Sequence, residues 1–195
     1  MQSIELVTGP SVWPLTVSEA KAHLRVDHSV DDTYIESLIK AATDTAERFQ
    51  NRRYINQTWR MTMDYFPPKS SVIEIPIGPV SSITSIVYVD EDGNSQTWSA
   101  SEYQVDTRST QARIVETPDY YFPDTKTGQI NAVTITFVVG YGAASSAVPE
   151  NIKHAIRLIV GDMYNQREDT VIGNIVNEMP RSAKMLLWQN RIVHF

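Results

Sequence analysis

The sequence has no cysteine among its 195 residues. This absence excludes disulfide bonds, thiolate metal sites and a thiol nucleophile. A chain of this kind suits a reducing compartment or an oxygen-insensitive particle.

The sequence also lacks an excess of positive charge. Lysine and arginine total 17, aspartate and glutamate total 23, and the formal net charge is −6. A negative protein gains little from releasing the counterions of a nucleic-acid backbone. The charge balance therefore argues against a dedicated, sequence-independent DNA-binding protein.

Long hydrophobic runs are missing as well. No run approaches the roughly 18 apolar residues of a membrane span, and the first residues do not form a basic, apolar leader. We find no internal repeat and no low-complexity tract. We therefore expect a soluble protein made in a cytoplasm, with one sizeable domain or one domain carrying an inserted subdomain.

The chain opens with two helical patterns. Thr16 and Glu19 form a capping box at the start of the segment 15–25. After a polar break, apolar residues recur at helical spacing from Ile35 to Phe49. Acidic residues precede this second helix and basic residues follow it, as the helix dipole favours.

From residue 57 the period of the pattern changes from 3.6 to 2. Short segments rich in β-branched and aromatic residues alternate with turn residues, which predicts strands at 57–63, 72–77, 83–89, 95–98, 103–106, 112–115 and 133–139. The acidic, glycine-containing run 89–95 predicts a hairpin. The spacing indicates a small antiparallel sandwich or barrel.

The chain closes with helices. Pro149 marks the start of a third amphipathic helix, and Pro180 precedes a short fourth one. The predicted class is α+β, a small helical bundle with an inserted antiparallel β-sandwich or barrel subdomain. The predicted organisation is N-terminal helices at 1–56, the β subdomain at 57–147, and C-terminal helices with a docking arm at 148–195 that form one structural unit with 1–56.

No catalytic, cofactor-binding or metal-binding set emerges from the sequence. The run from Asp90 to Asn94 resembles the start of a calcium loop, but its glycine comes two positions early, so we favour the hairpin. Gly140 and Gly142 follow a strand and precede a helix, but the dinucleotide fingerprint then fails at Ser145. The four histidines have no i, i+4 partner. We therefore predict no cofactor and no enzymatic activity.

An alternative function is a ligand- or carbohydrate-binding β module with helical flanks. Such a module needs an exposed aromatic platform, for which the candidates are Trp59, Trp98, Tyr120 and Tyr121. Aromatic residues in alternating strands are more often part of a core. Saturable binding in a glycan screen would favour the carbohydrate-binding alternative.

The last 24 residues are unusually apolar, with Trp188 and Phe195 among their large hydrophobic side chains. These side chains either fold back on the domain's own core or dock on another subunit, since exposed apolar anchors mark interfaces. Both possibilities remain open from the sequence.

Several segments together resemble the head-to-tail connector, or adaptor, proteins of tailed double-stranded-DNA bacteriophages and prophages. The resemblance starts at 6–10 and 14–27, and continues through 35–39, 57–59, 103–106, 137–142 and 148–156. It covers nearly the whole chain, and the order and spacing of the segments are more specific than any one of them.

The resemblance implies a structural protein of the virion neck, assembled in the cytoplasm of a bacterial host. Such connectors form a homo-oligomeric ring, commonly of twelve copies, below the portal protein, and extend the DNA channel to a tail-completion or stopper protein. Their contact with DNA is passing and not sequence-specific, and they bind no membrane. A monomer in solution is compatible with this role. Their C-terminal arm often docks on the portal, which implies portal or neighbour contacts for Met179, Leu186, Leu187, Trp188, Arg191 and Phe195.

Overall fold

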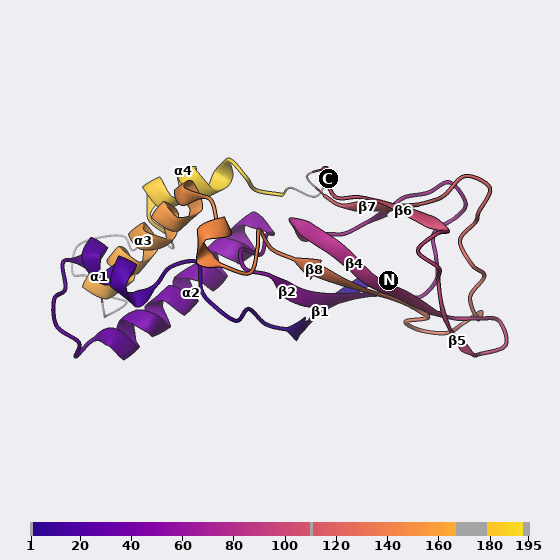
Figure 1. Cartoon of the computed structure of the whole chain (residues 1–195), viewed down its shortest axis with the longest axis horizontal. Helices are drawn as coiled ribbons and strands as arrows, with labels where there is room; N and C mark the ends of the chain where they lie inside the picture. The colour runs from indigo at the N-terminus through magenta and orange to yellow at the C-terminus, as the bar shows by residue number, and fades with distance from the viewer. Residues whose placement is uncertain (1, 110, 167–178, 193–195) are drawn as a thin grey trace. The chain divides into compact units, whose positions relative to one another are not determined.

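The chain folds into two compact units. The computed structural model describes residues 2–109, 111–166 and 179–192. The β unit comprises residues 1–10 and 56–141, and the helical unit comprises residues 11–55 and 142–193. Figure 1 shows strands in one unit and helices in the other. The α+β class expected from the sequence is confirmed.

The larger sheet of the β unit is antiparallel. Its strand order is β1-β2-β8-β4-β5. The strands run over β1 (Gln2–Thr8), β2 (Gln57–Met63), β8 (Val133–Val139), β4 (Val80–Val89) and β5 (Ser95–Thr97). Along β8, buried and half-buried residues alternate, as expected for a strand with one face against a core.

The smaller sheet of the β unit has the order β3-β7-β6 and covers one face of the core. Its strands are β3 (Ile73–Glu74), β7 (Arg113–Glu116) and β6 (Tyr103–Asp106). Ile73 and Ile114 from this sheet share one buried cluster with Met61, Ile135 and Phe137 from the larger sheet. In the part of the chain that the structure describes, the two sheets form a sandwich and do not close into a barrel.

The strand bounds follow the sequence closely, with three differences. The strand predicted at 83–89 begins earlier, at Val80. Only Ile73 and Glu74 of the segment 72–77 form a strand, because Pro76 has no N–H to donate to a ladder. Residues 1–10 belong to the β unit, whereas the sequence placed them with the helices, because β1 pairs with β2 from Gln2 opposite Met63. The predicted hairpin is confirmed, with Val89 opposite Ser95.

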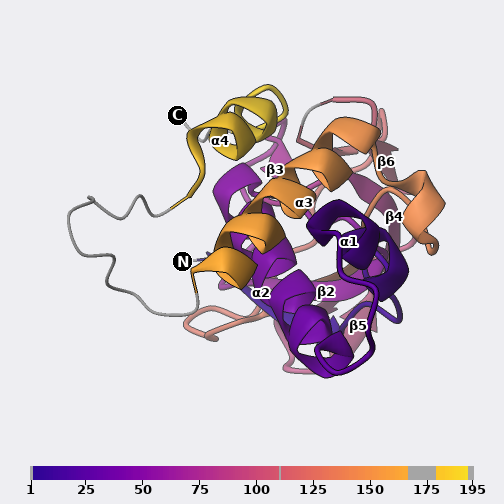
Figure 2. The ribbon, with the colours of Figure 1, turned by 90° about the vertical axis from the view of Figure 1, so that its left-hand side faces the viewer.

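The helical unit contains α1 (Val17–Leu24), α2 (Asp32–Gln50), the 3-10 turn η1 (Ser145–Ala147), α3 (Glu150–Asn165) and α4 (Arg181–Trp188). The third helix, α3, packs against each of the other three α-helices (Figure 2). Its buried side chains, which include Ile152, Ile156 and Ile159, form the centre of this unit. Within the described ranges, no helix is long and apolar enough to cross a bilayer.

Capping residues lie at the ends of α1, α2 and α3. The Thr16 hydroxyl accepts the amide of Glu19, and the Glu19 side chain accepts the amide of Thr16, so the capping box is confirmed. The second helix, α2, ends at Asn51, which adopts the left-handed conformation common after a helix. Pro149, predicted as the first helical residue, lies at the N-cap of α3, so the helix begins one residue later, at Glu150.

Candidate assembly surface

The C-terminal segment is fixed to the last turn of α2. Gln50 donates from Nε2 to the Leu187 carbonyl at 2.6 Å, and the Ile192 amide donates to the Gln50 carbonyl at 2.9 Å. Asn51 donates to the Ile192 carbonyl at 2.9 Å, and Arg52 donates to the Asn190 carbonyl. These bonds satisfy polar groups that a helix end leaves open, and they hold residues 187–192 in place.

The predicted partner-binding residues fall into different environments. Leu187 is fully buried inside the helical unit. Met179, Leu186 and Arg191 are half-buried, and Trp188 is 57% exposed. Phe195 lies outside the described residues. Of this group, Trp188 therefore presents the largest apolar surface that the structure shows.

Exposure also reveals a residue that the sequence reasoning missed. Met185 is 65% exposed, three positions before Trp188 on α4. Residues three apart lie on the same face of a helix. The spacing of apolar residues could have indicated this exposed face, because Ala183 and Leu187, which are buried, lie four residues apart on the opposite face of α4.

The Trp188 side chain is held by its neighbours. Its ring lies 6.0 Å from the Phe49 ring, centroid to centroid. The Arg191 guanidinium carbon lies 4.9 Å from the Phe49 centroid and 5.1 Å from the Trp188 centroid, within the range of a cation–π contact. The indole is therefore both exposed and ordered by contacts on one side.

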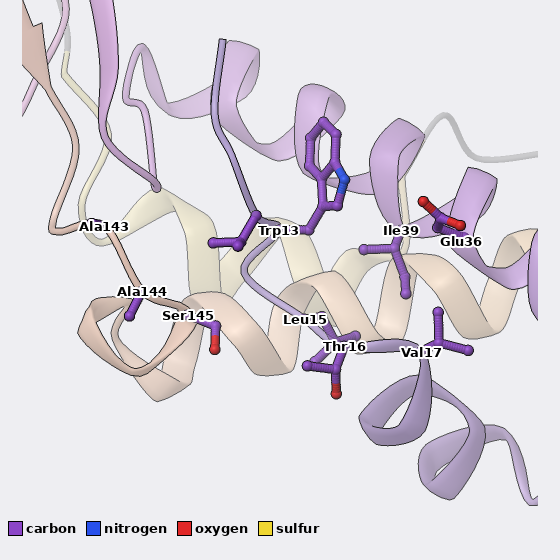
Figure 3. Close-up of a pocket in the computed structure, with 10 residues that line it drawn as sticks. Trp13, Leu15, Thr16, Val17, Glu36, Ile39, Ala143, Ala144 and Ser145 are labelled. Atoms are coloured by element: carbon purple, nitrogen blue, oxygen red, sulfur yellow. The ribbon is translucent and has the colours of Figure 1, made fainter.

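A second apolar feature of the helical unit is a pocket of about 460 Å³ beside the start of α1. We call it the α1–α2 pocket. Leu15 and Ile39, both almost fully buried, lie at its base, and the exposed Val12 lies at its rim. Figure 3 shows the Trp13 ring beside α2, close to Ile39, with Ala143 to Ser145 on another side. The Lys40 ammonium lies 5.9 Å from the Trp13 centroid and pairs with Glu36 at 2.8 Å.

An ion-pair network joins α1 to α3. The Lys153 ammonium lies 3.1 Å from a Glu19 oxygen and 3.2 Å from a Glu150 oxygen. Burial alone would raise the pKa of Glu19, but hydrogen bonds from Thr16 and Lys153 outweigh burial and lower it. Burial alone would lower the pKa of Lys153, but its bonds to the two glutamates raise it. The three groups therefore stay ionised at neutral pH and act as a structural clamp.

His23 lies near this network, close to Arg157, which pairs with Glu19 at 3.7 Å. Burial lowers the pKa of His23, and the nearby charges of His154 and Arg157 act in the same direction. His23 is therefore neutral near pH 7. In the described ranges, no group of three or more His, Asp or Glu side chains is arranged to hold a metal ion.

The aromatic platform required by the carbohydrate-binding alternative does not form. Trp98 is 2% exposed and packs in the core of the β unit, 5.4 Å from Phe66 and 4.9 Å from Tyr103 between ring centroids. Tyr120 and Tyr121 are exposed. Because Trp98 is buried, the four candidate residues do not share one binding surface.

The solved structures similar to this chain include two necks and one virion of GTA particles. The structure described as "Neck of empty GTA particle computed with C6 symmetry" contains a chain with a TM-score of 0.81 and 25% identity, covering 99% of this chain and 97% of that one. "Neck of native GTA particle computed with C12 symmetry" gives 0.79 and 25%, with the same coverage. "Virion of native gene transfer agent (GTA) particle" gives 0.80 and 24%, covering 98% and 96%.

No curated protein matches the sequence. The family model described as phage gp6-like head-tail connector protein matches residues 14–117, which include α1, α2 and β2 to β7. This match covers more than half of the chain, and the similar neck structures cover nearly all of it. The chain therefore belongs to the phage gp6-like head-tail connector proteins, a family of structural virion proteins.

Proposed function

We propose that this protein forms a closed ring in the neck of a phage-like particle, below the portal, and extends the DNA channel to the tail. The observation that carries the proposal is the similarity to neck chains over 97–99% of both lengths. Those necks were solved with C6 and C12 symmetry, and twelve copies is the number we propose here. The ring joins the portal on one side to a tail-completion or stopper protein on the other.

The distribution of charge supports a channel through which DNA slides. The β unit contains 5 basic and 11 acidic residues, a net charge of −6, whereas the helical unit contains 12 of each and is neutral. The whole excess negative charge of the chain thus lies in the β unit. We propose that β units contribute to an acidic lumen, which repels phosphates and prevents DNA from sticking.

Exposure is compatible with docking for four of the residues expected from the sequence, since Trp188 is 57% exposed and Met179, Leu186 and Arg191 are half-buried. Met179, Leu186, Trp188, Arg191 and Phe195 contact the portal or a neighbouring subunit in this proposal. Leu187 has a different task, because its fully buried side chain and the bond from Gln50 to its carbonyl hold α4 against α2. We assign no catalytic step to any residue. In this proposal the protein is assembled in the host cytoplasm and then has a structural role in the virion.

Analysis of purified particles tests this proposal. Quantitative mass spectrometry should find the chain in full particles at the copy number of a cyclic ring, twelve for each portal ring. Electron microscopy with a label on the chain should place it at the neck. Exclusion of the chain from particles that contain portal and tail would refute the proposal.

A further inference from the structure

Two apolar features lie at the surface of the helical unit. The first is the pair Met185 and Trp188 on α4, which are 65% and 57% exposed. We call this pair the α4 knob. The second is the α1–α2 pocket, about 460 Å³ in volume. Pockets of roughly 300–1,000 Å³ enclose drug-sized ligands, so this one has room for a bicyclic ring.

The α4 knob is conformationally preorganised for binding. Phe49 and Arg191 contact the indole of Trp188 from its own unit, so little rotamer freedom remains to be lost on association. Tryptophan is enriched among residues that dominate binding energy, and methionine adapts to irregular apolar surfaces. The backbone below the knob is also fixed, by the bonds that join residues 187–192 to α2.

The α4 knob and the α1–α2 pocket lie on different sides of the same unit. The fourth helix, α4, packs on α3 and on the end of α2, whereas α1, whose start borders the pocket, packs on α2 and α3. Figure 2 shows α1 and α4 on opposite sides of α3. A protein that carries a projection on one side and a matching recess on another makes head-to-tail contacts, which close into a ring when the rotation permits.

Charge favours the same pairing. Residues 179–192 include Arg181, Lys184 and Arg191 and no acidic residue. The segment around the pocket is acidic in comparison, since residues 11–40 contain five acidic side chains, Glu19, Asp27, Asp31, Asp32 and Glu36, against three basic ones, Lys21, Arg25 and Lys40. Potentials of opposite sign steer two surfaces together and fix their register.

We infer that the α4 knob of one copy of this chain inserts into the α1–α2 pocket of the next copy around the ring. Trp188 is the anchor, and Val12, Trp13 and Val17, which line the pocket and stay at least partly exposed, form its receptor. This inference rests on the proposed ring, and it assigns Trp188 to the neighbouring subunit rather than to the portal. Met179, Leu186, Arg191 and Phe195 remain the candidates for portal contact.

Cross-linking in the cysteine-free background tests the inference, because every introduced thiol is unique. Val12→Cys places a thiol at the rim of the pocket, and Met185→Cys places one on the knob. The two single variants are mixed, assembled with the portal protein of the same particle, and treated with a short bismaleimide linker. We expect covalent dimers from this mixture, at least tenfold more abundant than from either variant alone.

The matched control mixes Met185→Cys with Val30→Cys, whose position in the helical unit is 87% exposed but does not line the pocket. Rings visible by electron microscopy, together with equal cross-linking in the test and control mixtures, would refute the knob-and-pocket contact and leave the ring intact. Absence of rings would refute the proposed function and, with it, this inference.

A second variant provides an independent measurement. Trp188→Ala should leave the far-UV circular dichroism spectrum unchanged and lower the melting temperature of the subunit only slightly, since the half-exposed ring contacts Phe49 and Arg191 from its own unit. We expect it to weaken ring formation at least tenfold, measured as the protein concentration at half-maximal assembly, whereas Val30→Ala should not change that concentration. Normal assembly of the Trp188→Ala protein would contradict the inference.

Discussion

The two units of this protein differ in their balance of acidic and basic side chains. In the helical unit, acidic and basic side chains pair in networks, as in the Lys153 clamp between Glu19 and Glu150. In the β unit, acidic side chains outnumber basic ones, and Glu74, Glu91 and Asp92 are exposed. In the proposed ring, the neutral helical unit would make the contacts between copies, and the acidic β unit would face the DNA.

The largest expected effect concerns the core of the helical unit. Leu187→Ala should destabilise this unit by about 2–5 kcal/mol, because it leaves a cavity where a fully buried side chain packed. Hydrogen exchange followed by mass spectrometry should show faster exchange in α2, α3 and α4. Met185→Ala is the control on the exposed face of α4 and should change stability by less than about 0.5 kcal/mol.

The same experiment tests whether the units are independent. Exchange in β2, β8 and β4 should remain as slow in Leu187→Ala as in the unchanged protein. Loss of protection in both units at once would show that they unfold as one, and the division of labour between them would lose its structural basis.

A charge reversal addresses the β unit. Glu91→Lys with Asp92→Lys changes two exposed side chains in the β4–β5 hairpin and reduces the net charge of the β unit from −6 to −2. We expect at least tenfold tighter binding of duplex DNA at about 50 mM salt, measured by fluorescence anisotropy. Lys126→Gln, which makes the unit more acidic, should not increase binding. Salt-sensitive DNA binding by the unchanged protein would contradict the proposed repulsion.

The capping box offers a smaller effect, confined to the helical unit. Thr16→Ala removes the hydroxyl that accepts the Glu19 amide, which should cost about 1 kcal/mol in the free energy of unfolding. Thr16→Ser keeps that acceptor and should restore most of the loss. Chemical denaturation monitored by circular dichroism measures both variants, and equal stability of the two would argue against the cap as the cause.

The smallest effect is a pH dependence from His23. Because its pKa is lower in the folded than in the unfolded state, the unfolded chain binds more protons, and stability should fall as the pH drops below the ordinary value near 6.5. His23→Gln should make the melting temperature less sensitive to pH between about 7 and 5. An unchanged slope would show that the surroundings of His23 do not set this dependence.

Much of the fold could be predicted from the sequence because local signals agreed with one another. The capping box at Thr16, the apolar period of α2 and the turn residues between strands each specify local geometry. The position of β1 could not be predicted in this way, because a strand in which every residue is exposed has no alternating apolar pattern. Its place depends on pairing with β2, more than 50 residues away.

The candidate site was only partly predictable for a related reason. An apolar C-terminal stretch indicates that its side chains pack either on the core of their own unit or on another subunit. The sequence alone does not show which side chains face the core and which face outward. Leu187 and Trp188 are neighbours in the chain, yet one is buried and the other exposed. The α1–α2 pocket could not be predicted, because its lining comes from three separate segments and none of them has a pattern that indicates a pocket.

The most direct test of the central claim is a cryo-electron microscopy reconstruction of this protein bound to the portal of its own particle. The account predicts a closed ring with cyclic symmetry, a central channel wide enough for duplex DNA, and acidic side chains of the β unit at its wall. An open filament, an isolated dimer, or a channel lined by basic side chains would contradict it.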